Sequence, residues 1–156
     1  MPEHQIVLYS SEIGMIELVG TEQGLLSIRF LQGDAAVQID APECLRVCVT
    51  QLDEYFRGTR QEFSVPLDIQ GTDFEKQVWN AVAAIPYGTT RSYLDIAKTI
   101  GNPKAVRAVG LANGKNPLPI IIPCHRVIGS NGSLTGYGGG IWRKKWLLKH
   151  EGACLF

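Results

Sequence analysis

The chain has 156 residues, which is enough for one or two compact domains with a hydrophobic core. A hydrophobic content of 45% against 19% charged residues excludes intrinsic disorder, and no apolar run approaches the roughly 20 residues of a membrane span. The N-terminus carries acidic residues and lacks the basic start of a signal peptide. We therefore expect a soluble protein of the cytoplasm, or of the nucleus in a eukaryote, with no membrane partner.

The net charge of zero hides an uneven distribution along the chain. Residues 1–70 carry four Arg and eleven acidic residues, a net charge of about −7, whereas residues 71–156 carry eleven basic and four acidic residues, about +7. A basic half next to an acidic half predicts that the second half meets a polyanion such as nucleic acid. The alternative is that two oppositely charged domains attract each other.

The first 69 residues predict a strand-rich domain. Three segments rich in Ile, Val and Leu, separated by glycine and polar turn residues, favour an antiparallel meander: 5–10, 14–20 and 24–31. An amphipathic helix follows over 41–58, with Gly58 as its stop. Residues 61–69 predict a further strand, at a sheet edge because of Pro66.

The composition changes after residue 69, and the remainder of the chain is expected to be mainly helical. Two capping boxes, each a Ser or Thr followed three residues later by an acid, predict helix starts at Thr72/Glu75 and Ser92/Asp95. Gly101 ends the second of these helices, and Asn102 caps the next one with Pro103 at its first position. Two short helices joined by a tight turn predict a helix-turn-helix.

The second helix of this pair has an unusually small surface. Arg107 is the long polar side chain at its middle, and the residues around it are small: Ala105, Ala108, Gly110 and Ala112. Glycine inside a helix costs about 1 kcal/mol relative to alanine, so Gly110 needs a reason. Close helix packing and close approach to a nucleic-acid backbone are both open explanations.

The stretch IIIPCHRVIGS, residues 120–130, places a thiol, an imidazole and a guanidinium directly after three isoleucines. We expect a buried strand that ends at Cys124, then a Ser-Asn-Gly turn and a return strand, which resembles the hairpin of a winged helix. Cys124 and His125 are a candidate nucleophile and base. Glu151, one of four acids in the second half, is the candidate to orient His125. An isolated pair of this kind is more often structural.

The segment PCHRVIGSNGSLTGYGGG strongly resembles the active-site motif of the methylated-DNA–protein-cysteine methyltransferases, the 6-O-alkylguanine-DNA alkyltransferases. The resemblance covers essentially all of residues 72–152, while the N-terminal third agrees in length and strand-rich pattern. It implies an α+β protein with a ribonuclease-H-like domain at 1–69. A winged-helix domain at 70–156 would bind DNA and accept the alkyl group.

The resemblance also implies the activity. Such a protein repairs DNA by direct reversal, and transfers the alkyl group of a flipped-out 6-O-alkylguanine irreversibly to its own Cys124. The substrate 4-O-alkylthymine is left open. The partner is double-stranded DNA held by its minor groove, with no cofactor and no metal. We expect a monomer, and cooperative assembly on DNA is left open.

The roles implied for the reaction centre fall on four residues. Cys124 accepts the alkyl group, and His125 deprotonates it through water. Glu151 holds the imidazole, and Tyr93 donates a proton to the departing guanine.

Further roles concern DNA and the base pocket. Arg107 would enter the base stack, and a slim helix surface at Ala105, Ala108 and Gly110 would allow close approach to the minor groove. Asn116 matches the family's structural hinge. The implied pocket consists of Tyr137, Gly138, Val127 and Trp79. Some relatives carry serine at the position of Gly138, so backbone groups would serve here instead.

Two alternative functions are disfavoured by the sequence. Relatives that only bind alkylated DNA replace the acceptor cysteine, so Cys124 argues against a pure binding module. Transcriptional regulators of this type usually carry an extra metal-binding domain, for which 156 residues leave no room. Arg126 has no clear role in the motif, and a bridge to the acidic N-terminal half is one expectation for it.

Overall fold

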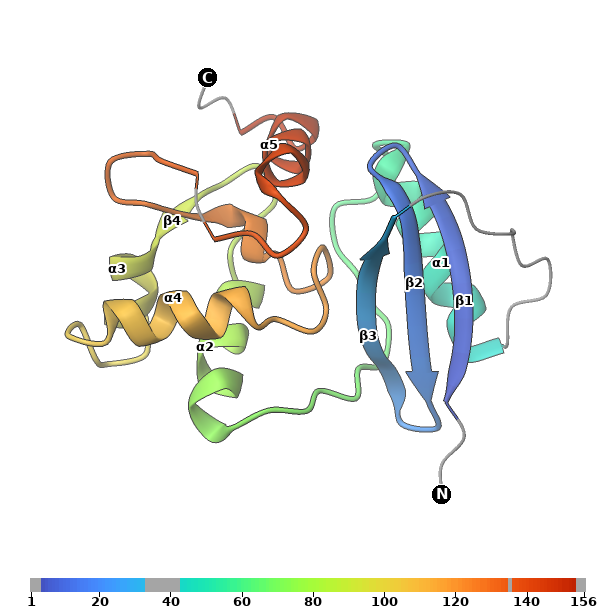
Figure 1. Cartoon of the computed structure of the whole chain (residues 1–156), viewed down its shortest axis with the longest axis horizontal. Helices are drawn as coiled ribbons and strands as arrows, with labels where there is room; N and C mark the ends of the chain where they lie inside the picture. The colour runs from blue at the N-terminus through green and yellow to red at the C-terminus, as the bar shows by residue number, and fades with distance from the viewer. Residues whose placement is uncertain (1–3, 33–42, 135, 154–156) are drawn as a thin grey trace. The chain divides into compact units, whose positions relative to one another are not determined.

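The computed structural model describes residues 4–32, 43–134 and 136–153. The chain divides into two compact units, Met1–Gln70 and Gly71–Phe156 (Figure 1). Among the described residues, no helix has the length and apolar character needed to cross a membrane.

The N-terminal unit is a three-stranded antiparallel sheet with one helix on its face (Figure 1). The strands are β1 (Gln5–Ser11), β2 (Gly14–Thr21) and β3 (Gly24–Leu31), in the order β1-β2-β3. Helix α1 (Glu43–Phe56) packs against all three strands. The meander and the amphipathic helix expected from the sequence are therefore confirmed.

The predicted edge strand over 61–69 is wrong in extent. It is reduced to one parallel bridge between Leu25 and Leu67, in which the amide of Leu25 donates to the Pro66 carbonyl at 2.9 Å. Gly24 permits this approach, because a Cβ built on it would lie 2.5 Å from the same Pro66 oxygen. Proline cannot donate to a ladder, so pairing does not extend through it.

The C-terminal unit is mainly helical. Its helices are α2 (Asp73–Ala83), α3 (Tyr93–Thr99), α4 (Val106–Gly114) and α5 (Ile141–His150). Helices α2, α3 and α4 pack on one another. The two-residue strands β4 (Arg91–Ser92) and β5 (Val127–Ile128) pair in parallel. A 3-10 turn, η1 (Cys124–Arg126), contacts both α2 and α5.

Both predicted capping boxes are present. The Thr72 hydroxyl accepts from the Glu75 amide at 3.1 Å, and the Glu75 carboxylate accepts from the Thr72 amide at 2.9 Å. Ser92 and Asp95 exchange the same two bonds at 3.0 and 2.8 Å. Each box satisfies two amides that a helix start leaves without partners, which explains why α2 and α3 begin where they do.

The helix-turn-helix is formed by α3 and α4, but α4 begins later than predicted. Asn102 does not cap it; the Asn102 carbonyl instead accepts from the Ala105 amide at 3.0 Å and closes a turn. Pro103 lies inside this turn, where its fixed φ suits the second position. The helix starts at Val106, and Ala105 takes the capping position without a side-chain bond.

The strand predicted for the isoleucine run is wrong. Residues 117–122 form turns and bends, and Ile120 has a φ of +76°, in the left-handed region and outside the extended range of a strand. The amide of Ile122 donates to the Leu118 carbonyl at 2.8 Å, so it is used within the turn. Prolines at 119 and 123 lack the amides that a ladder needs. Cys124 therefore begins a 3-10 turn and does not end a strand.

The return strand of the expected hairpin is also not formed among the described residues after β5. The Ser-Asn-Gly turn itself is present, because the Gly129 amide donates to the Ser133 carbonyl at 2.9 Å. Strand β5 finds its partner in β4, which precedes the helix-turn-helix, and this pairing attaches the segment after Cys124 to the start of α3.

Candidate active site

Two asparagine side chains bond to the turn that carries Cys124: Asn113 in the last turn of α4 and Asn116 just after this helix. Asn113 Nδ2 donates to the Cys124 carbonyl at 3.3 Å, and Asn116 Nδ2 donates to the Ile122 carbonyl at 2.7 Å. Asn116 Oδ1 also accepts from the Leu118 amide at 2.9 Å. These bonds tie the helix-turn-helix to the turn that carries the thiol, and the Cys124 residue is only 6% exposed.

Glu151 follows α5 directly, and its carboxylate is shared by His125 and Arg126. His125 Nε2 lies 2.8 Å from Glu151 Oε2. Arg126 donates from Nε to Oε1 at 2.8 Å and from a terminal nitrogen to Oε2 at 2.9 Å, a two-pronged pair. The third Arg126 bond goes to the Ile85 carbonyl at 2.7 Å. These three Arg126 bonds all lie within the C-terminal unit, and the expected bridge to the acidic N-terminal half is not among them.

The protonation states of Glu151 and His125 follow from burial together with their hydrogen bonds and neighbouring charges. Burial would raise the pKa of Glu151, but the hydrogen bonds and charges of His125 and Arg126 outweigh it and hold that pKa well below its usual range. Burial lowers the pKa of His125, although Glu151 opposes this. His125 is thus neutral at neutral pH, and its Nδ1 is buried with no hydrogen-bonding partner among the described residues. It is placed to accept a proton.

The thiol is protonated in the resting protein. Burial raises the pKa of Cys124 to about 11, while a hydrogen bond from Asn116 and the charge of Lys144 oppose the rise. The site therefore needs a base before the sulfur can act as a nucleophile.

Lys144 is a site residue that the sequence did not single out. It is fully buried, and its Nζ donates to the Val127 carbonyl at 2.7 Å and lies 6.0 Å from the Tyr93 ring centre. Burial lowers the pKa of Lys144 to about 8, and Cys124 opposes this. Lys144 lies three and four residues before the buried Leu147 and Leu148, so helical spacing places it on the same face as they are. This signal is present in the sequence, but Lys144 stands in a run of basic residues, which indicates an exposed position.

Tyr93 and the glycine-rich segment border the same region. A Cβ built on Gly136 would lie 3.4 Å from the Tyr93 hydroxyl, and one built on Gly110 would lie 3.8 Å from the Tyr93 ring. Tyr137 is buried, and burial together with the nearby Cys124 raises its pKa well above the usual value. Gly138 is exposed, and a Cβ built on it would lie 4.0 Å from the Gly114 carbonyl oxygen.

The remaining expected residues lie in two different settings. Trp79 is buried on α2, and its indole N–H donates to the Ala112 carbonyl on α4 at 2.8 Å. Val127 is fully buried in β5. On α4, Arg107 and Ala108 are exposed, and Ala105 is half-buried at the start of the helix.

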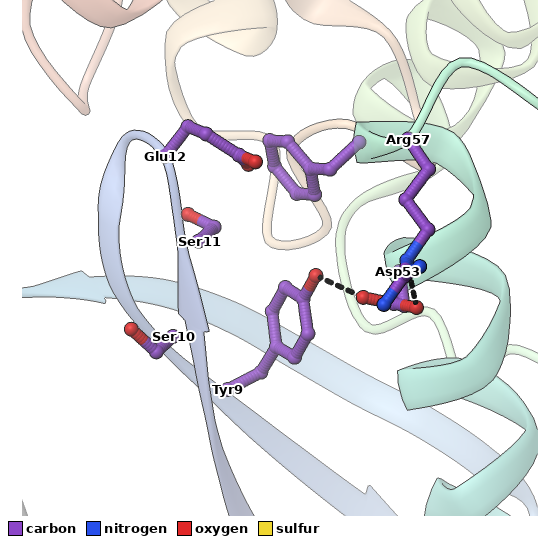
Figure 2. A pocket seen from close by; sticks show the side chains of 7 residues that line it. Tyr9, Ser10, Ser11, Glu12, Asp53 and Arg57 are labelled. Carbon is purple, nitrogen blue, oxygen red and sulfur yellow. Dashed lines mark hydrogen bonds and ion pairs between the residues drawn. The ribbon is translucent and has the colours of Figure 1, made fainter.

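A hollow with a volume of about 410 Å³ lies in the N-terminal unit (Figure 2). It is lined by side chains of β1, the following turn and α1: Tyr9, Ser10, Ser11, Glu12, Asp53, Phe56 and Arg57. The Asp53 carboxylate accepts from Tyr9 at 3.2 Å and pairs with Arg57 at 2.7 Å. Burial and Asp53 raise the pKa of Tyr9, so its hydroxyl stays protonated.

The fold and the site together define a helix-turn-helix protein with a buried cysteine thiol, a neutral histidine and a carboxylate hydrogen-bonded to that histidine. The family described as "6-O-methylguanine DNA methyltransferase, DNA binding domain" matches residues 73–153. The ribonuclease-like domain of the same family matches residues 6–69. The chain belongs to the 6-O-methylguanine DNA methyltransferase family.

Individual relatives are similar over nearly the whole chain. The methylated-DNA–protein-cysteine methyltransferase of Methanosarcina acetivorans is 51% identical over 152 residues, which cover 94% of this chain and 97% of the relative. The crystal structure of the Mycobacterium tuberculosis O6-methylguanine methyltransferase superposes with a TM-score of 0.86 at 48% identity, covering 97% and 94% of the two chains. The structure of M. tuberculosis OGT in complex with DNA gives 0.85 at 50% identity, covering 94% and 91%.

The first prediction concerns the ion pair of Arg126 with Glu151. Arg126→Met and Glu151→Gln should each lower the free energy of unfolding by about 3–5 kcal/mol, because each leaves a buried charge without the opposite charge that compensates it. The double variant should lose less than the sum of the two. Urea unfolding of all four proteins measures the coupling.

The exposed pair of Arg46 with Glu43, 3.7 Å apart, is the control and should show coupling below about 1 kcal/mol. Additive losses at Arg126 and Glu151 would contradict the shared carboxylate.

The second prediction concerns Lys144. Lys144→Met removes a charge that favours the thiolate, so the pKa of Cys124 should rise above about 11. Its reaction with iodoacetamide should slow by about tenfold at a given pH, the effect of about one pKa unit. Peptide mass mapping at several pH values measures the rate at Cys124. Lys145→Met, which removes the exposed neighbouring charge, is the control. Coincident pH profiles for the wild type and Lys144→Met would refute the coupling.

Proposed function

We propose that this chain repairs DNA by transferring the alkyl group of 6-O-alkylguanine to Cys124. The observation that carries this proposal is the buried thiol of Cys124, followed in the chain by the buried His125, whose Nε2 lies 2.8 Å from the Glu151 carboxylate. The family description and the names of the relatives state this activity for those proteins. Residues 70–156 would bind DNA and accept the alkyl group, and residues 1–69 would form the ribonuclease-like domain.

The reaction is a displacement at the alkyl carbon. The sulfur–carbon bond forms as the bond from that carbon to guanine O6 breaks, and the electron pair of the broken bond stays with the guanine. The Cys124 proton passes through one water to His125 Nδ1, which the Glu151 bond at Nε2 leaves as the acceptor nitrogen. The buried Glu151 carboxylate then stabilises the imidazolium that forms.

Tyr93 is the proposed proton donor to the departing guanine. Its hydroxyl borders Gly136, and the Lys144 ammonium lies over its ring. The product on Cys124 is a thioether, which does not hydrolyse under mild conditions. Each molecule therefore acts once. The reaction needs no cofactor and no metal.

Helix α4 is the proposed DNA-contacting element. Arg107 and Ala108 are exposed on it, and a Cβ on Gly110 would be no closer than 3.8 Å to Tyr93. Packing within the chain therefore does not require glycine there, which supports close approach of the minor groove as its reason. Arg107 would enter the base stack and offset the few kcal/mol that flipping costs. The small side chain of Ala105, at the start of α4, would allow the same close approach to the minor groove.

The other assignments concern the pocket and the assembly. Tyr137, Gly138, Val127 and Trp79 would line the base pocket, and Asn116 would act as the hinge. We further propose that the chain acts as a monomer in the cytoplasm, with cooperative assembly on DNA and reaction with 4-O-alkylthymine as extensions of the same activity.

The third prediction tests the transfer itself. Incubation with a duplex that contains one 6-O-methylguanine should raise the intact mass by one methyl group, located on Cys124 by peptide mapping. Cys124→Ala should show no gain. Unchanged mass together with tight binding of the lesion would instead indicate a binding module and would refute the proposal.

The fourth prediction concerns Arg107. Arg107→Ala should slow transfer from a duplex by about tenfold or more, because no side chain then fills the gap in the stack and the base flips out less readily. Transfer from the free base 6-O-benzylguanine should change by less than about twofold, since no flipping is needed. Lys104→Ala removes an exposed charge just before α4 and controls for weaker phosphate attraction. Equal losses on both substrates would argue against a role in flipping.

A further inference from the structure

Three consecutive glycines, residues 138–140, lie between Tyr137 and helix α5. The residue on their N-terminal side, Tyr137, is buried, and a Cβ on the neighbouring Gly136 would lie 3.4 Å from the Tyr93 hydroxyl. The Tyr93 ring lies 6.0 Å from Lys144 Nζ, which bonds to the Val127 carbonyl shortly after Cys124, so this part of the loop belongs to the candidate site. Glycine loses more conformational freedom on folding than any other residue. A wall made of three glycines therefore needs support from outside the loop to hold one shape.

The first turn of α5 supplies this support. The guanidinium of Arg143 donates to the Gly139 carbonyl at 2.6 Å, and the Arg143 amide donates to the Gly140 carbonyl at 3.2 Å. Within the loop, the Gly140 amide donates to the Tyr137 carbonyl at 3.0 Å. Arg143 thus binds the middle and the end of the glycine segment at once.

Trp142 holds the Arg143 guanidinium in place. Its ring stacks on the guanidinium with the carbon 4.4 Å from the ring centre. A Cβ on Gly140, whose φ is +95°, would lie 3.3 Å from the Trp142 ring. A planar guanidinium combines stacking with directed hydrogen bonds in a way that lysine cannot. Trp142 remains 55% exposed, which is unusual for so large an apolar side chain and points to a role outside core packing.

We propose that Arg143 and Trp142 are positioning residues that hold the triglycine segment, residues 138–140, against the Cys124 site and so limit the size of the alkyl group accepted. This inference rests on the proposed alkyl transfer. We call Arg143 and Trp142 together the brace. With the brace intact, the triglycine segment forms a fixed wall. Without it, the glycines sample wider conformations and admit a larger group, while a methyl group is less well aligned for attack.

The test compares Arg143→Met and Trp142→Ala with the wild type on two duplexes, one with 6-O-methylguanine and one with 6-O-benzylguanine. Single-turnover rate constants for transfer to Cys124 are measured at saturating protein. Both variants should raise the benzyl-to-methyl rate ratio by about fivefold or more, a change within the range that pocket shape controls. Trp142→Phe, which keeps an aromatic face, should stay near the wild-type ratio. Lys145→Met, an exposed charge on the same helix, is the matched control.

Hydrogen exchange supplies a readout that does not depend on activity. Amides of the triglycine segment should exchange faster in Arg143→Met and Trp142→Ala, with the rest of the chain unchanged, which also shows that the variants are folded. If a variant fails to fold, Arg143→Lys replaces it and should show the same changes to a smaller extent, since its charge is kept and its planar stacking is lost.

The outcomes separate the brace from its alternatives. An unchanged rate ratio with unchanged exchange overturns the proposal. An unchanged ratio with weaker binding to an unmodified duplex also overturns it, and assigns Trp142 and Arg143 to contact with DNA. If the wild type transfers neither group, the proposed alkyl transfer is what fails, and the proposal on alkyl size falls with it.

Discussion

The carboxylate of Glu151 is the interaction on which the reactive site depends. It joins the end of α5 to the turn that carries Cys124, and through Arg126 it reaches the carbonyl of Ile85 beyond α2. Three segments far apart in the chain thus meet at one buried charge. Removing a charge from water is costly, and the cost is recovered only when its hydrogen bonds are satisfied. Arg126 provides the compensating charge, so that His125 can remain neutral beside the same carboxylate.

Burial acts on Cys124, His125 and Lys144 in the same direction, because it favours the neutral form of each. Cys124 is therefore a thiol and His125 an imidazole, whereas the pKa of Lys144 falls only to about 8, which leaves it mainly an ammonium at neutral pH. A thiol in this state is poorly reactive towards chance electrophiles. In the proposed transfer, the proton would move as the alkyl carbon is attacked, which would confine the chemistry to a substrate that is correctly placed. Low reactivity at rest suits a protein that is consumed by a single transfer, as proposed.

The proposed substrate region has small residues on two sides, with different physical consequences. On α4, the small residues are part of a regular helix, whose own hydrogen bonds keep it rigid while it stays slim. After Tyr137, the glycines have no such ladder, and the structure compensates with Arg143 and Trp142 from the next helix. A slim helix and a braced loop are therefore two solutions to the same need for close approach.

The sequence by itself determined the elements that depend on neighbours in the chain. The capping boxes at Thr72 and Ser92, the three-strand meander and the pairing of Cys124 with His125 as candidates could all be read from short-range patterns. Tertiary structure alone decided the turns before Cys124, the parallel pairing of β5 with β4, and the partners of Arg126 and Lys144. The physical reason is that prolines and a left-handed Ile120 exclude a strand, while buried charges take partners 17 to 41 residues away, which no local pattern specifies.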